Sequence, residues 1–302
     1  MGLKHAAHYV RMPPEGACSR EVSGILHHSR PGTDPESTRW HGKKYVALGS
    51  SFASGPAIAP REPDAPRLAG RSRNNYAHLV AAAAQLELTD VTSSGATCEH
   101  ILHEQQYGQP PQIRAVDSAT DLVTLTIGGN DVGLTQYRIA HRLPLPLRLI
   151  PPIARLGDET AVNHRLHTIE QSLTEVLTTI ARRAPRARVL VVNYLSLLGP
   201  VSAQDRPVDR NYQQFAESLA AHTASAAARA DAELIDARTP SLDHPPGSTG
   251  AWTIGGYLPL PGRQYPGAPF HPTAAGMAGV ADLILDRLAS LPPIEPQPTA
   301  ES

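Results

Sequence analysis

The stretch VTLTIG, residues 123–128, contains only apolar or β-branched side chains before its glycine. A second stretch, VLVVNYL at residues 189–195, begins in the same way. A strand with one buried face alternates apolar and polar residues, whereas a strand covered on both faces is a continuous apolar run. These two stretches therefore predict buried strands of a parallel sheet.

Shorter strand candidates and longer helical patterns alternate on both sides of these stretches. The helical pattern is clearest in residues 164–184, where apolar residues recur every three or four positions. The expected strands are Tyr45–Leu48, Leu88–Thr92, Leu122–Ile127, Val189–Tyr194 and Glu233–Asp236, and the expected helices are Asn74–Leu86, Thr97–Gln106, His164–Ala184, Asn211–Ala230 and Thr273–Leu291. This alternation predicts an α/β fold, a three-layer α/β/α sandwich around a central parallel sheet of about five strands.

Both ends of the chain differ from this middle part. Residues 1–42 are rich in His, Pro, Ser, Gly and Arg and have no periodicity, which predicts a mobile leader. Residues 292–302, PPIEPQPTAES, predict a disordered tail for the same reason. We therefore expect a single α/β domain over residues 43–291.

Composition excludes several classes of protein. Among 302 residues, 27 basic and 28 acidic side chains give a net charge of −1, which indicates neither a nucleic-acid surface nor a polybasic membrane patch. Two cysteines cannot build a disulfide framework. No run approaches the ~18 apolar residues of a membrane span. No apolar segment of ~7–15 residues precedes the first prolines, so we expect a cytoplasmic protein, with leaderless secretion left open.

Small polar turns follow three of the predicted strands. They are GSSFASG at residues 49–55, SSGAT at 93–97 and GGND at 128–131, and a fourth polar segment, PFHP at 269–272, precedes the last helix. Ligands of open α/β sheets bind beyond the carboxyl ends of the strands. We therefore expect these four segments to meet at one edge of the sheet.

The side chains of these segments complement one another chemically. Ser51 offers a hydroxyl nucleophile and His271 a base that takes its proton. The N–H groups of Ser51 and Gly95, with the amide of Asn130, would make a three-donor oxyanion hole. This set of groups is typical of acyl transfer. Ser54, in the same turn as Ser51, is the alternative nucleophile.

The four segments, in this order, resemble the motif blocks of the SGNH (GDSL-type) serine hydrolases, and most closely the actinobacterial-type esterases and lipases. The resemblance covers residues 43–291 and implies a flavodoxin-like SGNH hydrolase fold. It also implies a serine carboxylester hydrolase acting on a small ester with an aliphatic acyl group. Ser51 and His271 would be catalytic, and Ser51, Gly95 and Asn130 would hold the oxyanion. We expect no cofactor and no metal ion.

Two positions depart from the family pattern. Ser50 stands where the family's first block has Asp, and Ala268 stands where the last block has the acid that orients the histidine. Replacing such an acid by a neutral amide costs a serine protease ~10⁴ in turnover. We expect a backbone carbonyl, that of Ala268, to orient His271 instead, with Asp236 and Asp243 as alternatives. The departures leave open a catalytically impaired relative that binds acyl or glycan ligands.

Three further features have competing interpretations. The segment CEHILH, residues 98–103, places Cys98, His100 and His103 close together, but no fourth metal ligand is apparent. Residues 143–153, LPLPLRLIPPI, are apolar but poorly suited to a helix, and would form a loop over a sheet edge or a lip of an acyl cleft. A phosphate-binding module on the same fold would leave the GGND turn and His271 without a role.

Overall fold

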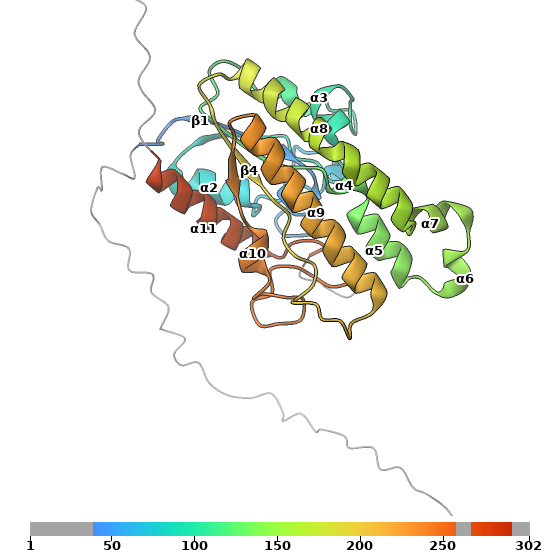
Figure 1. The fold of residues 1–302 in the computed structure, drawn as a ribbon. Coiled ribbons are helices and arrows are strands. Elements are labelled where there is room, and N and C mark those ends of the chain that lie inside the picture. Colours follow the sequence, from blue (N-terminus) through green and yellow to red (C-terminus); the bar gives the residue numbers. More distant parts are fainter. Residues whose placement is uncertain (1–38, 258–266, 292–302) are drawn as a thin grey trace, which may run out of the picture. The chain divides into compact units, whose positions relative to one another are not determined.

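The computed structural model describes residues 39–257 and 267–291. In the described part, five parallel strands form one sheet in the order β2-β1-β3-β4-β5 (Figure 1). The strands are β1 (Lys44–Gly49), β2 (Glu87–Asp90), β3 (Leu122–Thr126), β4 (Arg188–Val192) and β5 (Glu233–Ile235). The predicted five-stranded parallel sheet is confirmed, with strand ends that differ from the prediction by at most two residues.

Helices flank this sheet and connect its strands. They are α1 (Ser51–Ser54), α2 (Tyr76–Ala84), α3 (Cys98–Leu102), α4 (Gly129–Val132), α5 (Leu134–Arg142), α6 (Leu145–Arg148), α7 (Pro151–Leu156), α8 (Glu159–Arg183), α9 (Pro207–Arg229), α10 (Arg238–Ser241) and α11 (Ala274–Ser290). Two short 3₁₀ helices, η1 (Arg67–Ala69) and η2 (Gln112–Ala115), lie in the connections. Helix α3 ends at Leu102, short of the predicted Gln106, and the chain then makes a tight antiparallel turn between Gln106 and Gln109.

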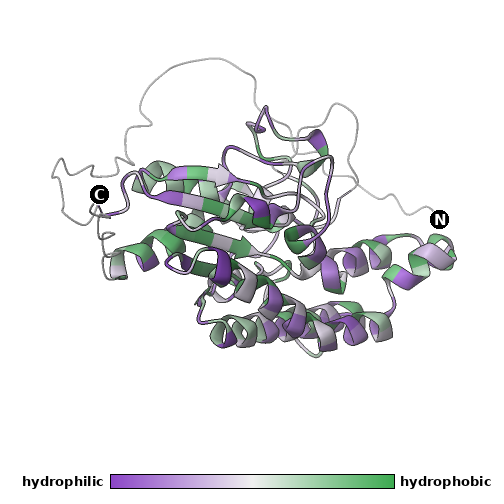
Figure 2. Ribbon diagram, turned by 90° about the horizontal axis from the view of Figure 1, so that it is seen from above, coloured by the Kyte–Doolittle hydropathy of each residue, from purple (hydrophilic) through white to green (hydrophobic). Residues whose placement is uncertain are grey.

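Burial follows the position of each strand in the sheet. Every residue of β3 is buried, and β1 and β4 are buried beyond their first residue, whereas the edge strand β2 is half exposed. Figure 2 shows hydrophobic colour along the central strands. Burial on both faces is the reason that the stretches at 123–128 and 189–195 lack alternation.

The helices form the two outer layers of the predicted sandwich. Helices α8 and α9 pack together on one side of the sheet, and α2 packs with α11 (Figure 1). Helix α8 buries the apolar stripe that its sequence predicted. It begins five residues earlier than expected, at Glu159, because the Asp158 side chain caps it by accepting a hydrogen bond from the Thr160 N–H.

Two sequence predictions are wrong in detail. Residues 143–153 were expected to be poorly helical, yet α6 and α7 form there because their prolines lie in the first helical turn, where no N–H is needed. Trp40, which was assigned to the leader, is buried and donates its indole N–H to the Leu288 carbonyl at 3.3 Å. The predictions for residues 1–38 and 292–302 lie outside the described residues.

The carboxyl end of β1 is shaped by the close approach of two backbones. Gly49 has φ +140°, and a Cβ placed on it would lie 2.5 Å from the carbonyl oxygen of Thr126 on β3. Real Cβ atoms do not approach a backbone oxygen so closely, so this position requires glycine. Strand β1 therefore leaves the sheet at a point where its backbone is still in contact with that of β3.

We expect Gly49→Ala to lower the free energy of unfolding by about 2–4 kcal/mol, because strain at positive φ adds to a clash with backbone that cannot move aside. Gly108→Ala is the matched control, since Gly108 has φ +77° but open space around its Cβ position. It should cost only about 1–2 kcal/mol. Urea denaturation measures both, and equal costs would contradict the clash.

Candidate active site

The first candidate turn places Ser51 at the start of α1, directly after β1. Ser50 is extended, and its N–H donates to the Thr126 carbonyl at 2.9 Å. Ser51 is 6 % exposed. Among the described residues, neither its hydroxyl nor its N–H has a hydrogen-bond partner. The turn therefore presents both an uncommitted hydroxyl and an uncommitted N–H from one residue.

Gln112 fixes this turn through both ends of its side-chain amide. The Gly49 N–H donates to Gln112 Oε1 at 2.8 Å, and Gln112 Nε2 donates to the Gly49 carbonyl at 3.1 Å. The same carbonyl accepts the Ser93 N–H at 3.0 Å. The second candidate turn, which Ser93 begins, is thereby attached to the first.

The second and third turns are also joined directly. Gly95 has φ +81°, and within the described residues its N–H has no acceptor. Asn130 Nδ2 donates to the carbonyl of the adjacent Ala96 at 2.9 Å, and Asp131 Oδ1 accepts the Cys98 N–H at 2.9 Å. An amide nitrogen carries two hydrogens. The second hydrogen of the Asn130 amide therefore remains for a ligand, and so does the Gly95 N–H.

Tyr194, just beyond β4, connects the third turn to the first. Its hydroxyl accepts the Gly129 N–H at 2.9 Å and lies 2.9 Å from Ser50 Oγ. Burial raises the pKa of Tyr194 well above its ordinary value, so the phenol stays neutral and pairs with Ser50 hydroxyl to hydroxyl. This neutral bridge runs through the position where the family pattern has Asp.

His271 is held by a backbone carbonyl. Its Nδ1 lies 2.7 Å from the Pro269 oxygen, and because a carbonyl only accepts, Nδ1 carries the hydrogen and Nε2 is left as an acceptor. Its ring centroid lies 5.7 Å from that of Phe52, the residue after Ser51. Burial lowers the pKa of His271, while the Pro269 carbonyl acts in the opposite direction.

The carbonyl bonded to His271 belongs to Pro269, not to Ala268 as the sequence analysis expected. The chain reverses at Phe270, where φ is +59°, and the carbonyl of Pro269 comes back to the ring. The Ala268 N–H donates to Pro56. Of the alternative acids, Asp236 accepts hydrogen bonds from Asn193 and from Thr239, and neither it nor Asp243 contacts His271 in the described part of the chain.

Backbone pairing holds the His271 segment against the loop before it. The Ile254 N–H donates to the His271 carbonyl at 2.9 Å, and the Phe270 N–H donates to the Ile254 carbonyl at 3.1 Å. The hydroxyl of Thr253 donates to the Ser196 carbonyl at 2.7 Å. His271 is thereby tied to the segment that follows β4, at the same edge of the sheet as the three turns.

Other candidate features do not come together in this way. His100 Nδ1 lies 2.7 Å from the Thr97 hydroxyl, as part of a cap of α3, and Cys98 is buried. Over residues 39–257 and 267–291, no three metal-binding side chains form a cluster. None of the helices in these ranges is long and apolar enough to cross a bilayer.

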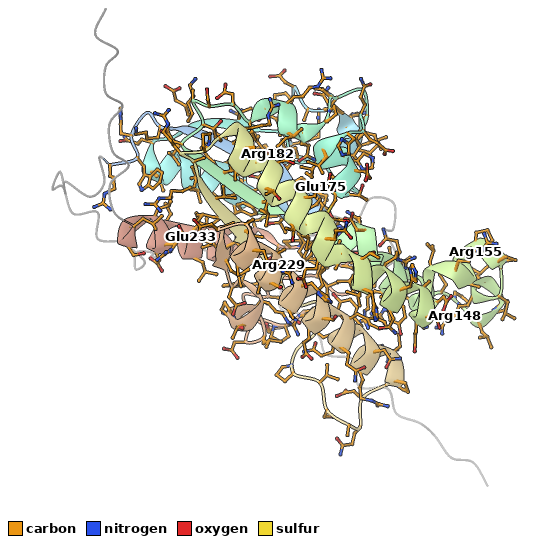
Figure 3. All side chains as sticks on the ribbon, turned by 45° about the horizontal axis from the view of Figure 1, so that its top comes forward. Arg148, Arg155, Glu175, Arg182, Arg229 and Glu233 are labelled. Carbon is orange, nitrogen blue, oxygen red and sulfur yellow. The ribbon has the colours of Figure 1, made fainter. Side chains whose placement is uncertain are left out.

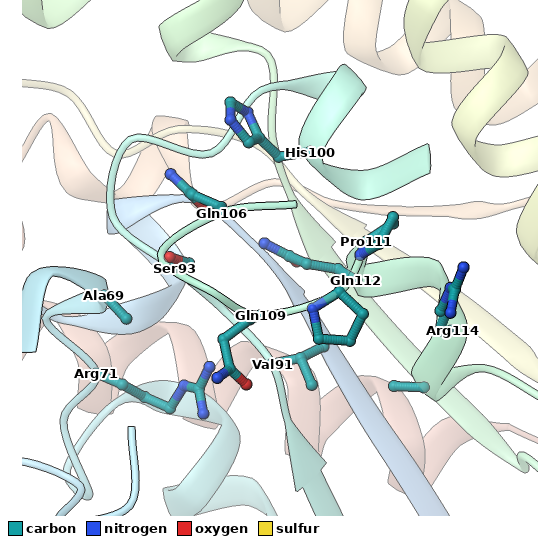
Figure 4. A pocket seen from close by; sticks show the side chains of 12 residues that line it. Ala69, Arg71, Val91, Ser93, His100, Gln106, Gln109, Pro111, Gln112 and Arg114 are labelled. Atoms are coloured by element: carbon teal, nitrogen blue, oxygen red, sulfur yellow. The ribbon is translucent and has the colours of Figure 1, made fainter. Parts of the chain in front are cut away.

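A separate cavity of about 240 Å³ lies behind the second turn (Figure 4). Ser93 and Gln112, which both support Gly49, line it together with Arg71 and Arg114. Neither Ser51 nor His271 is among its lining residues. It therefore adjoins the supports of the candidate site rather than its reacting groups.

Sequence reasoning missed two supporting residues, Tyr194 and Gln112. Tyr194 is the last residue of the predicted strand Val189–Tyr194 and lies just beyond the observed end of β4 at Val192, so the search of strand ends that led to the other turns stops just short of it. No local pattern marks Gln112, because it lies in a 3₁₀ helix and contacts Gly49 only through the tertiary fold.

Comparisons with known proteins find a matching family, related sequences and a similar fold. The family model of the GDSL-like lipase/acylhydrolases matches residues 47–278. A lipase of Streptomyces rimosus is 28 % identical over 242 residues, 78 % of this chain and 82 % of that protein. Lipase 2 of Streptomyces coelicolor is 46 % identical over 87 residues, 29 % of each chain. The crystal structure of the extracellular lipase from Streptomyces rimosus superposes with a TM-score of 0.65 at 26 % identity, covering 82 % of this chain and 100 % of that one.

We expect Tyr194→Phe to lower the free energy of unfolding by about 1–3 kcal/mol, because it leaves the buried Gly129 N–H without an acceptor. Ser50→Ala is the matched control. It also breaks the Ser50–Tyr194 bond but leaves Gly129 paired, and Ser50 makes no side-chain cap to α1 that would be lost. Urea denaturation should show the larger loss for Tyr194→Phe, and equal losses would contradict the bridging role.

Proposed function

Because this chain belongs to the GDSL-like lipase/acylhydrolase family and is a carboxylester hydrolase, we propose that it acts through an acyl-enzyme on Ser51 with His271 as general base. The family and the fold are those of the SGNH esterases and lipases of the actinobacterial type. The roles of individual residues and the order of the steps are our proposal.

The observation that supports this proposal most is the state of the His271 ring. Its Nδ1–H is bound to the Pro269 carbonyl, so Nε2 has a lone pair, and the ring lies tilted against that of Phe52, which follows Ser51. A general base needs its lone pair beside the nucleophile's proton. Lowering of the His271 pKa by burial keeps the ring neutral, which is the form that accepts a proton.

In the first half of the reaction, Ser51 Oγ forms a bond to the ester carbon while its proton passes to His271 Nε2. The carbonyl π electrons move to oxygen, which accepts hydrogen bonds from the N–H groups of Ser51 and Gly95 and from Asn130 Nδ2. When the tetrahedral intermediate collapses, the C–O bond to the alcohol breaks. His271 then donates its proton to the departing alcohol.

In the second half, a water molecule attacks the acyl-enzyme and gives its proton to His271. Collapse of this intermediate returns the proton to Ser51 and releases the carboxylic acid. The names of the relatives support an ester with an aliphatic acyl group, and the apolar Phe52 beside the nucleophile is suited to such a group. No cofactor enters these steps.

We expect Ser51→Ala and His271→Ala each to lower the kcat for p-nitrophenyl ester hydrolysis by a factor of about 10³ or more, because the two residues act as one unit. Ser54→Ala is the matched control. Ser54 lies in the same helix α1 and is fully buried, with its hydroxyl 3.2 Å from that of Ser94. Its replacement should leave turnover within about threefold.

Activity that persists in Ser51→Ala but disappears in Ser54→Ala would move the nucleophile to Ser54. A wild-type protein that binds esters, fails to hydrolyse them and does not react with a fluorophosphonate probe would support a catalytically impaired ligand-binding protein instead. That alternative rests on Ser50 and Ala268, the two positions where the family pattern has an acid.

We expect the acidic limb of the kcat/KM profile to have its midpoint below the ordinary imidazole value of 6.5, because burial lowers the pKa of His271 and the neutral ring is the active base. Ala268→Asp should move this limb upward by about one pH unit or more, since a nearby carboxylate stabilises the imidazolium. Ala268→Asn, similar in size but uncharged, is the control and should leave the limb in place. If Ala268→Asp left the midpoint of the acidic limb as unchanged as Ala268→Asn does, His271 would not be the titrating base.

A further inference from the structure

Exposed apolar side chains gather in one part of this molecule. Of the nine large hydrophobic side chains that are exposed in the described residues, six lie between residues 139 and 156, which we call the apolar arm. The six are Ile139, Leu145, Leu147, Leu149, Ile150 and Leu156. Leu145 and Leu149 are 67 % and 73 % exposed. Exposed apolar side chains that gather in one segment, rather than lying singly over the surface, are a feature of interaction sites.

The apolar arm also has one sign of charge. Between Asp131 and Asp158 the sequence has no acidic residue and four arginines. Arg138 is buried and paired with Asp209. The side chains of the other three arginines contact backbone carbonyls or solvent. Arg148, for example, donates to the carbonyls of His141 and Leu143. A carbonyl satisfies the hydrogen bonds of a guanidinium without neutralising it, so the arm keeps its positive charge.

The arm extends from the rim of the candidate active site. Helix α5 follows directly after α4, which carries Asn130, and Arg142 at its end donates to the Gly256 carbonyl at 3.3 Å. In Figure 1, α6 and α7 project beyond the end of α8. Figure 3 shows Arg148 and Arg155 on this projecting part, away from the sheet.

We propose that the apolar arm docks this enzyme on an anionic lipid surface. Leucines that enter the acyl boundary together with arginines that face lipid phosphates are the pattern of interfacial binding. A second copy of this chain fits less well, because a two-fold contact would bring the same arginines together without an acidic partner. The net charge of the whole chain, −1, does not reveal this positively charged segment, because acidic residues elsewhere in the sequence offset its arginines.

The docking surface is separable from the proposed chemistry. Vesicle binding can be measured on the full chain carrying Ser51→Ala, so that no lipid is hydrolysed during the assay. Hydrolysis of soluble p-nitrophenyl acetate can be measured on the same arm variants with Ser51 intact. Failure of the docking surface and failure of the Ser51–His271 mechanism therefore give different results.

We expect the full chain to sediment with vesicles of phosphatidylcholine and phosphatidylglycerol, more weakly at high salt. Leu145→Ser combined with Leu149→Ser should lower the partition coefficient by about tenfold or more. Arg155→Gln should lower it about fivefold on these vesicles and leave it unchanged on phosphatidylcholine alone. Leu68→Ser is the matched apolar control, since Leu68 is 69 % exposed on η1, and Arg182→Gln on α8 is the charge control.

Three outcomes would overturn the proposal. Equal vesicle binding by the arm variants and the controls would remove the arm from the interface. A wild-type dimer that the double leucine variant abolishes, in the absence of vesicle binding, would identify a second copy as the partner. A loss of p-nitrophenyl acetate hydrolysis in the double leucine variant would make the arm part of the acyl cleft instead.

Discussion

The candidate site depends on the contact between the backbones of β1 and β3 at Gly49. Gly49 lies so close to the Thr126 carbonyl that no side chain fits there, and directly after this contact Ser51 begins a helix rather than continuing the strand. The N–H of Ser51 is therefore released from the sheet ladder and left uncommitted. Gln112 holds both polar groups of Gly49, which gives this turn a fixed geometry before any ligand arrives.

From that turn, hydrogen bonds extend to each neighbouring strand end. Ser93 is hydrogen-bonded to Gly49, and Asn130 to Ala96. The Tyr194 hydroxyl is hydrogen-bonded to that of Ser50, in the first turn. All of these bonds lie within the protein and involve buried or half-buried groups, so their loss leaves unpaired donors or acceptors. Two of the three donors proposed for the oxyanion are backbone N–H groups and the third is the side-chain amide of Asn130, and all three follow strand ends, as expected for an open parallel sheet.

The sequence was sufficient to predict the sheet and the order of the polar turns, because buried parallel strands and glycine-rich turns are local patterns. It was insufficient for contacts that span the fold. Nothing near Gln112 indicates its bond to Gly49, and the carbonyl at His271 was assigned to Ala268 because the reversal at Phe270 has no signal in the sequence. The short helices after residue 143 are not apparent in the sequence because proline disrupts the interior of a helix but is tolerated in its first turn.

The two departures from the family pattern are consistent with each other. Ser50 and Tyr194 form a neutral bridge, and the Pro269 carbonyl is a neutral acceptor for His271, so neither position contributes a negative charge to the site. A neutral acceptor preserves the tautomer of the ring but stabilises an imidazolium less than a carboxylate does. The weaker stabilisation therefore raises the free energy of the transition state, where the ring becomes charged, and leaves that of the resting protein unchanged. In the proposed mechanism such a base remains neutral in mild acid, and the rate would depend more strongly on the donors proposed for the oxyanion at Ser51, Gly95 and Asn130.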